Sequence, residues 1–166
     1  QVMQRIADEV GETVNFAIPD SDGMIYLERI ETDWPFRVQL PVGTHVPFHC
    51  TASGKTFMAS LAPKVRTNMV GSLRLEKLTK NTLIDAENLL NELRLVAKQG
   101  YAIDNEEFVD GMVAIAVPIK DEFGRYVASL AFHGPLQRLS VEGATLRKDV
   151  LLNGAKTMKD ILFTET

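Results

Sequence analysis

Three things are scarce in this 166-residue chain, and each scarcity excludes a class of protein. The single cysteine rules out an internal disulfide and favours a reducing compartment. Lys and Arg together number 18 against 22 Asp and Glu, and no basic run offers a clustered positive face for phosphates, which argues against the chain itself binding nucleic acid. No apolar run approaches the roughly 20 residues of a membrane-spanning helix, and no signal peptide opens the chain, so we expect a cytoplasmic protein.

What the chain does have fits one soluble domain. Its length suffices for a sizeable core, and its 45% hydrophobic content is ordinary for a globular protein. Val2, Ile6 and Val10 recur every four residues, which predicts a short amphipathic helix that ends at Gly11. Because the chain begins with Gln1 rather than Met, we expect a fragment in which residues 1–12 end a linker helix and residues 13–166 form the domain. A peripheral packing helix is the alternative for residues 2–10.

The remaining elements alternate between hairpins and helices. Strands are expected in pairs at residues 15–19 with 24–30 and at 112–119 with 125–132, and singly at 36–40 and 101–103. Helices are expected at residues 54–61, at 63–70, from a capping box Thr82-x-x-Asp85 to Gly100, and at 140–162. Candidate core positions of the last helix are Val141, Leu146, Val150, Leu151, Ala155, Met158 and Leu162. Hairpins imply an antiparallel sheet and helices must cover its faces, so the fold class is α+β.

The chain is organised around residues 42–61, which read as a loop that ends in a helix start. Thr51 and Ser53 are both candidate N-caps, and Gly54 would let the backbone approach a ligand. The first amides of such a helix lack internal partners and, with the helix dipole, attract a carboxylate or phosphate. We therefore expect this helix start to form one wall of a small-molecule pocket.

The last predicted hairpin has one face of small side chains. If Lys120 pairs with Arg125, Ala114 faces Ala131, Ala116 faces Ser129, and Met112 faces His133. The other face is bulky and apolar, as a core requires. Small side chains on a sheet either let a helix pack closely or leave a hollow, and the pattern alone leaves both open.

Several candidate chemistries have a plainer interpretation. Gly54-Lys55-Thr56 resembles the end of a P-loop, but His49 occupies the position of the required first glycine, so we reject nucleotide hydrolysis. Lys55 is then a surface lysine or a source of positive potential for an anionic ligand. Asp104 follows the short strand in a cluster of acids, which are either solvated charges or acceptors for ligand hydroxyls. No cofactor and no metal ion is expected.

Cys50 lies beside His49 with His45 nearby, but nothing in the sequence supplies the base and orienting group that a catalytic cysteine requires. We expect a buried structural cysteine. The spacing His45-x-x-x-His49 suits a helical metal site, yet Pro47 lies between them in a predicted loop, so metal binding is not expected. Trp34, Pro35 and Phe36 are either core aromatics or a lid over an apolar ligand.

Taken in order, these segments resemble a known family. The resemblance covers about Val14 to Leu162, and the series of segments carries it rather than any one of them. The segments are Leu40-Pro41-Val42-Gly43, His49 with Thr51-Ala52-Ser53-Gly54-Lys55, Thr79 and Thr82, Gly100-Tyr101, Asp104-Asn105-Glu106-Glu107, Gly111, Ala116-Val117-Pro118-Ile119 and Gly134-Pro135. This series is similar to the C-terminal effector-binding domain of bacterial isocitrate-lyase-regulator (IclR) transcription factors.

The resemblance implies a GAF-like fold, with a curved antiparallel sheet between helices on both faces. It implies a cytoplasmic sensor of small organic acids that assembles as homodimers or homotetramers. It also implies an N-terminal winged helix-turn-helix domain, absent from this chain, that binds promoter DNA. Activity would be regulatory, with no catalysis.

The resemblance also implies an effector site. Its expected residues are Trp34, Pro35, Phe36, Ala52, Ser53, Gly54, Asp104, Ala114, Ser129, Ala131 and His133, with the effector carboxylate on the amides of Ser53 and Gly54. The chain departs from the family where small hydroxyl residues often stand, because Ala131 cannot donate a hydrogen bond and His133 is bulkier and titratable. This departure disfavours the smallest keto acids and favours a larger carboxylic acid, aromatic ones included.

Two rival hypotheses stay open at this level. One is an enzyme on a similar fold that uses Cys50 or the neighbouring histidines. The other is a pure dimerisation module in which a packing helix fills the hollow.

Overall fold

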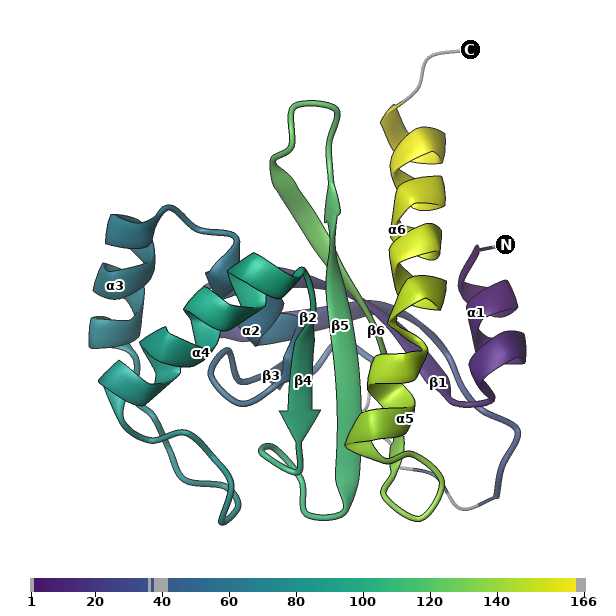
Figure 1. Cartoon of the computed structure of the whole chain (residues 1–166), viewed down its shortest axis with the longest axis horizontal. Coiled ribbons are helices and arrows are strands. Elements are labelled where there is room, and N and C mark those ends of the chain that lie inside the picture. The colour runs from purple at the N-terminus through teal and green to yellow at the C-terminus, as the bar shows by residue number, and fades with distance from the viewer. Residues whose placement is uncertain (1, 36, 38–41, 164–166) are drawn as a thin grey trace.

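The computed structural model describes residues 2–35, 37 and 42–163, and within them a curved antiparallel sheet forms the centre of the protein (Figure 1). The sheet has the order β3-β2-β1-β6-β5-β4, so the first and last hairpins lie side by side through β1 and β6. Its strands are β1 (Thr13–Asp20), β2 (Gly23–Ile30), β3 (His45–Val46), β4 (Ala102–Asn105), β5 (Met112–Lys120) and β6 (Tyr126–Pro135).

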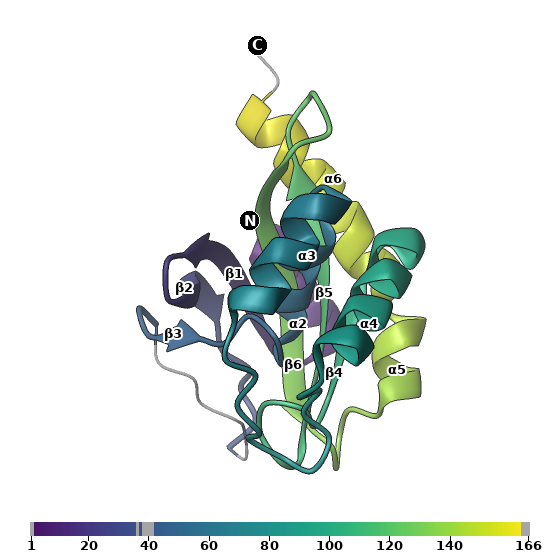
Figure 2. The same ribbon diagram turned by 90° about the vertical axis from the view of Figure 1, so that its left-hand side faces the viewer.

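Helices cover both faces of the sheet, as the fold class predicted. They are α1 (Val2–Val10), α2 (Ala52–Ala59), α3 (Pro63–Ser72), α4 (Ala86–Gln99), α5 (Val141–Leu146) and α6 (Lys148–Phe163). Helices α2, α3 and α4 lie on one side of β5, whereas α1, α5 and α6 lie on the other (Figures 1 and 2). None of the helices in the described ranges is long and apolar enough to cross a bilayer.

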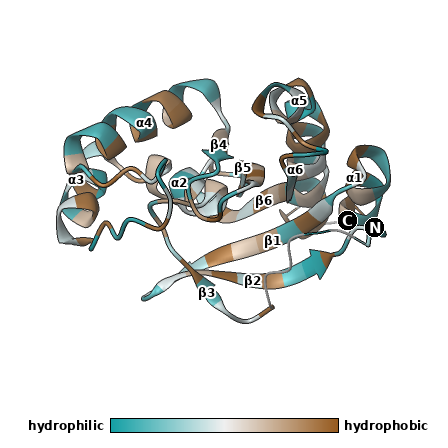
Figure 3. Ribbon diagram, turned by 90° about the horizontal axis from the view of Figure 1, so that it is seen from below, coloured by the Kyte–Doolittle hydropathy of each residue, from teal (hydrophilic) through white to brown (hydrophobic). Residues whose placement is uncertain are grey.

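Each face of the sheet has its own apolar core. The bulky face of the last hairpin, which includes Ile115, Val117 and Phe132, is fully buried beneath α1, α5 and α6. On the other face, Leu89 and Leu93 of α4 pack with the apolar side chains of α2 and β2. Figure 3 shows the hydrophobic strands between these two helical layers. The long helices thus bury one apolar face each, as their spacing predicted.

The predicted pairing of β5 and β6 is wrong by two residues. Ala114 pairs with His133 and Ala116 pairs with Ala131. The loop spans five residues, because Lys120 pairs with Tyr126, and a β-bulge between Ile119 and Lys120 adds one more residue to β6. Side chains alternate with a period of two, so a shift of two leaves the residues of β6 from Ala128 onward on their predicted face. Before the bulge, Tyr126 lies on the α2 side, with its ring 5.3 Å from that of Phe57.

Two helix predictions also need correction. The Thr82 hydroxyl accepts hydrogen bonds from the amides of Leu78 and Thr79 instead of capping a helix, and Asp85 is the N-cap of α4. The single helix expected at residues 140–162 is broken at Arg147 into α5 and α6. Consequently Leu146, predicted in the core, is 83% exposed. The strand expected at residues 36–40 falls almost entirely outside the described residues.

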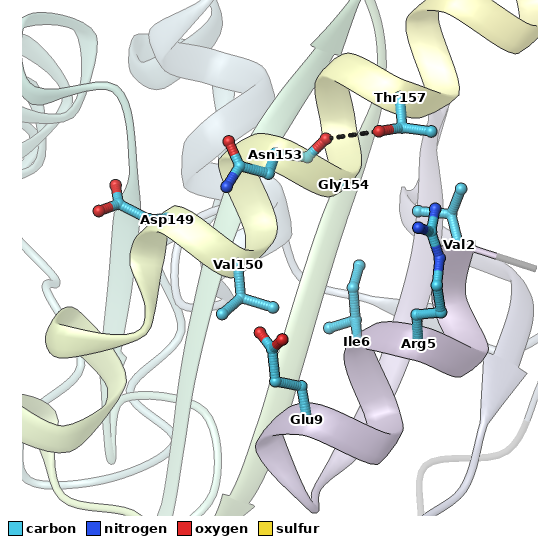
Figure 4. A pocket seen from close by; sticks show the side chains of 9 residues that line it. All are labelled: Val2, Arg5, Ile6, Glu9, Asp149, Val150, Asn153, Gly154 and Thr157. Atoms are coloured by element: carbon cyan, nitrogen blue, oxygen red, sulfur yellow. Dashed lines mark hydrogen bonds between the residues drawn. The ribbon is translucent and has the colours of Figure 1, made fainter.

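The N-terminal helix α1 belongs to the packed structure. Its apolar face is buried against α6, where a Cβ added at Gly154 would come within 2.6 Å of Ile6 Cδ1. Beside this contact the two helices form a groove of about 270 Å³ (Figure 4). Polar side chains are spread along its walls, and Thr157 Oγ1 donates to the Asn153 carbonyl of its own helix. No convergent polar set marks this groove as a recognition site.

Candidate functional site

A cavity lies where the start of α2 meets the small-residue face of the sheet. Ala52, Ala114, Ala116 and Ala131 form a separate buried cluster there, so α2 packs closely over most of this face. The remaining cavity is about 10 Å³, which is room for about one water molecule. Its lining residues are Asn15, Tyr26, Thr51, Ala52, Ser53, Asp104, Met112, Ala114, Ala131 and His133. Six of the predicted site residues therefore line this cavity, and they come from α2, from β4 and β5, and from β6. They are Ala52, Ser53, Asp104, Ala114, Ala131 and His133.

The local sequence explains how α2 presents its first turn. Thr51 is the N-cap, and its Oγ1 accepts a hydrogen bond of 3.0 Å from the Gly54 amide. The amides of Ala52 and Ser53 donate to no acceptor within the described part of the chain. These two amides, rather than those of Ser53 and Gly54, are the donors that the helix start offers to the cavity.

Gly54 serves packing instead of ligand approach. A Cβ at this position would lie 2.3 Å from the Phe48 carbonyl oxygen and 2.6 Å from Phe48 Cα, and neither backbone atom can move aside. The Gly54 amide is already bonded to Thr51, and Gly54 is not among the residues that line the cavity. The glycine is needed so that the capping loop can pass over α2.

Replacing Gly54 with alanine should lower the free energy of unfolding by about 1–3 kcal/mol through overpacking. The matched control is Gly71→Ala in α3, where an added Cβ meets nothing within 4 Å. That control should be neutral or slightly stabilising, because alanine is the better helix former. Urea denaturation of both variants checks the difference, and equal stabilities would show that the loop yields easily.

Other predicted site residues lie elsewhere. Ser129 is fully buried, and its hydroxyl donates to the Ser53 carbonyl at 3.0 Å, so it fastens α2 to β6. Trp34 and Pro35 line a groove beside α1 instead of the cavity. There the Arg138 guanidinium lies over the Trp34 ring, 5.2 Å from its centre. Phe36 falls outside the described residues.

Asp104 is the cavity residue with the least satisfied polar group. Its side chain is 1% exposed, and Oδ1 accepts a 2.7 Å hydrogen bond from the Glu107 amide. Oδ2 is buried and has no hydrogen-bond partner among the residues that the structure describes. Burial, followed by the negative charge of Glu107, raises the pKa of Asp104 to about 7. A buried acceptor without a partner indicates a place where a ligand or water donates a hydrogen bond.

Lys55 corrects both sequence interpretations, because it is neither on the surface nor available to an anion. Its side chain is fully buried, and Nζ lies 2.8 Å from Glu92 Oε2 and 2.9 Å from Glu107 Oε1. Nζ also donates to the Ile103 carbonyl at 2.5 Å. Burial alone lowers the pKa of Lys55, but the two carboxylates outweigh it and the net shift is upward. The ammonium group is therefore neutralised within the protein.

This buried ion cluster holds the acidic loop in place beneath the cavity. Glu107 Oε2 accepts from the Asn105 amide at 2.9 Å, and the Thr82 hydroxyl donates to the Glu107 carbonyl at 2.7 Å. Thr79 Oγ1 donates to the Glu106 carbonyl at 2.6 Å. Because the Glu107 amide in turn contacts Asp104, the cluster fixes the direction of the Asp104 carboxylate.

Sequence reasoning missed several residues of the cavity wall. Asn15 on β1 is 1% exposed, and its Nδ2 lies 2.8 Å from His133 Nδ1 on β6. Tyr26 on β2 and Met112 on β5 complete the wall. A usable signal existed for Asn15, which is the one strongly polar residue in the apolar run Val14–Ile18. Tyr26 and Met112 carry no such signal, because their types are ordinary in strands.

The catalytic hypothesis finds no support at Cys50. The cysteine is fully buried, and burial followed by the charge of Asp104 raises the pKa of its thiol to about 12. A reactive cysteine needs the opposite shift. His49 Nε2 lies 2.8 Å from the Glu76 carbonyl, whereas His45 Nε2 lies 2.7 Å from Asp20 Oδ2. Among the described residues no three His, Cys, Asp or Glu side chains gather as a metal site.

Comparison with known proteins identifies the family to which this chain is similar. The family model described as "Bacterial transcriptional regulator IclR C-terminal" matches residues 1–158. The chain is 37% identical over 141 residues to the probable transcriptional regulator SauR of Cupriavidus necator, covering 85% of this chain and 56% of that protein. The chain spans a little over half the length of the curated relatives it matches.

Solved structures show the same fold. The crystal structure of Thermotoga maritima IclR has a TM-score of 0.90 and 29% identity, covering 97% of this chain and 65% of that chain. The inducer-binding domain of PobR from Acinetobacter, a double mutant in complex with 3-hydroxybenzoic acid, has a TM-score of 0.88 and 23% identity. It covers 97% of this chain and 95% of that chain.

Proposed function

The chain belongs to the C-terminal domain family of IclR-type bacterial transcriptional regulators, and from this premise we propose that it senses a small organic acid in the cavity beside Asp104. Effector binding would modulate promoter binding by an N-terminal winged helix-turn-helix domain. The protein would work in the cytoplasm as a homodimer or homotetramer. The chain would carry no catalysis, which agrees with the raised pKa of the buried Cys50 thiol.

One observation carries the proposal: the cavity holds an unsatisfied acceptor and unsatisfied donors. Within the described ranges, Asp104 Oδ2 lacks a donor and the amides of Ala52 and Ser53 lack an acceptor. A molecule with a carboxylate and a hydroxyl satisfies both sides, because the carboxylate can accept from the amides while the hydroxyl donates to Asp104. The PobR domain that shares this fold was crystallised with 3-hydroxybenzoic acid, which has both groups.

The cavity size sets a condition on the mechanism. A space of about 10 Å³ cannot hold a benzoate, so the effector must bind a more open conformation. A ligand shifts a two-state equilibrium only by its difference in affinity for the two states. An effector that fits only the open state has a much higher affinity for that state than for the closed one. Its binding would therefore favour the open state, in which α2 has moved relative to β6. Such a displacement is what a sensor requires.

We test the proposal by thermal unfolding with hydroxybenzoates and with small keto acids. A true effector at 100 times its Kd should add about 2.7 kcal/mol of stability, a rise in Tm of roughly 5–10 °C for a domain of this size. Ala131→Leu fills the cavity and should abolish the rise. Ala97→Leu is the control, because Ala97 is exposed on α4 and should leave the rise intact.

A rise that survives Ala131→Leu would place the effector site elsewhere. The small cavity also keeps one rival in view, a pure dimerisation module with a filled hollow. No rise with any acid, together with a stable dimer by light scattering, would favour that rival.

A further inference from the structure

Arg29 on β2 carries a buried positive charge that the described part of the chain compensates poorly. Its side chain is 6% exposed, whereas its carboxylate partner Glu31 is 44% exposed and lies 3.7 Å from Nη1. Nη2 is buried and finds no hydrogen-bond partner among the described residues. Burial lowers the pKa of this guanidinium, but an arginine keeps its charge at neutral pH. Buried charges in proteins are normally paired, so this group is a candidate contact for an anionic ligand.

The Nη2 donor of Arg29 is directed toward the wall of the cavity. In a guanidinium, Nε and Nη2 lie on one edge and their hydrogens point in nearly the same direction. Nε donates to Asn15 Oδ1 at 3.2 Å, and Asn15 lines the cavity. The guanidinium carbon also lies 5.6 Å from the centre of the Tyr26 ring, which belongs to the same wall. Arg29 therefore contacts two wall residues and directs a pair of parallel donors at one of them.

The strand register brings Arg29 to this place. Asn15 pairs with Arg29 across β1 and β2, and with Ala131 across β1 and β6. Side chains paired across antiparallel strands project from the same face of a sheet. Arg29 therefore lies in one row with Ala131 on the small-residue face, two strand spacings or roughly 10 Å away. The long arginine side chain shortens this distance, so a small molecule seated against Ala131 can reach the guanidinium.

We propose that Arg29 is an effector-binding residue that receives a second anionic group, so that the effector is a hydroxy acid with two negative charges. This inference deepens the proposed function and rests on it, because the first carboxylate still binds the amides of Ala52 and Ser53. In the open conformation the second carboxylate replaces Asn15 Oδ1 in front of Nε and Nη2. It accepts from both donors, and such charge-assisted bonds are roughly twice as strong as neutral ones.

The site then discriminates between acids by their charge. One carboxylate meets the donors at the start of α2, the other meets Arg29, and the hydroxyl donates to Asp104 Oδ2. An acid with a single carboxylate fills one of the two anion positions and leaves the other without an acceptor. A hydrogen bond to a charged group supplies about 10- to 100-fold in affinity, which is the preference expected for the dianion.

Two matched pairs of acids test this preference by isothermal titration calorimetry at pH 7. Malate carries a carboxylate where 2-hydroxybutyrate has a methyl group, and 5-hydroxyisophthalate is 3-hydroxybenzoate with one added carboxylate. In at least one pair, the dianion should bind the wild type about 10- to 100-fold more tightly than the monoanion. Arg29→Met should abolish this preference and leave the affinity for the monoanion nearly unchanged.

Two further variants separate the role of Arg29 from a general effect of charge. Arg29→Lys should keep a smaller preference, because lysine supplies the charge without two parallel donors. Arg74→Met is the matched control, since it removes an exposed arginine and the same unit of charge, and it should keep the full preference. The wild type and Arg29→Lys decide the question even if Arg29→Met fails to fold.

The outcomes distinguish this inference from the function on which it rests. If a monoanion binds the wild type as tightly as its dianion, or if the preference survives Arg29→Met, the role of Arg29 is wrong while acid sensing stands. Binding of none of the four acids also overturns the inference. If thermal unfolding then finds no stabilising acid at all, the proposed function fails as well.

Discussion

Replacing Lys55 with methionine should lower the free energy of unfolding by about 3–5 kcal/mol, a large share of the stability of a domain of this size. Methionine matches the aliphatic length of lysine but removes the ammonium group. Glu107, whose side chain is 9% exposed, would then be a buried carboxylate beside Asp104 with no cation, and Glu92 would lose its partner as well. Uncompensated buried charge is among the largest single-residue penalties.

Urea denaturation at pH 7 measures this effect, with Lys64→Met as the control. Lys64 is an exposed lysine of α3, and its replacement should change stability by less than about 0.5 kcal/mol. Adding Glu107→Gln to Lys55→Met should recover part of the loss, because the orphaned charge disappears. A Lys55→Met variant as stable as the control would show that water reaches the cluster and solvates the carboxylates.

Replacing Asp104 with asparagine should make the effector-free protein more stable at pH 8 while weakening effector binding. The pKa of Asp104 is raised from 3.8 to about 7 in the folded protein. The folded state therefore binds more protons than the unfolded state between these values, and this group's contribution to stability falls as the pH rises. Three pKa units correspond to about 4 kcal/mol. The neutral amide avoids this penalty while its Oδ1 can still accept from the Glu107 amide.

The comparison requires unfolding free energies of both proteins at several pH values. The advantage of Asp104→Asn should be near zero at pH 4 and should grow to as much as about 4 kcal/mol at pH 8. Binding of the effector should weaken by roughly 10-fold or more, because a charge-assisted hydrogen bond contributes about 1.5–3 kcal/mol. A wild type as stable as the variant at pH 8 would mean that Asp104 is already neutralised or solvated. A stabilised variant with unchanged affinity would remove Asp104 from the binding site.

Patterns that depend on neighbouring residues were predicted well. The Gly100 helix end and the hairpin at residues 13–30 follow from local conformational preferences, as does the cap at Thr51, which was one of two candidates beside Ser53. The small face of the last hairpin was assigned to the correct side despite the error in register, because a shift of two preserves the alternation of side chains. The β-bulge beside Lys120 could not be predicted from the sequence, because no residue type at that place requires a bulge.

The errors share one cause, which is that burial and partners are properties of the assembled chain. Lys55 looked like a surface charge, yet Glu92 and Glu107 lie 37 and 52 residues away and bury it. Thr82 resembled a helix cap, but its hydroxyl donates to a carbonyl 25 residues further along the chain. Trp34 and Pro35 were expected at the cavity mouth because the family resemblance implied it, and they lie beside α1 instead.

By itself the sequence determined the α+β class, the two layers of helices and the face on which small side chains gather. These three features depend on the spacing and size of side chains, which can be read directly from short stretches of the sequence. Only the tertiary structure decided which polar atoms find no partner there among the described residues, namely Asp104 Oδ2 and the amides of Ala52 and Ser53. The physical reason is that a hydrogen bond needs two partners within about 3 Å, and these partners meet only when β1, β4, β6 and α2 come together.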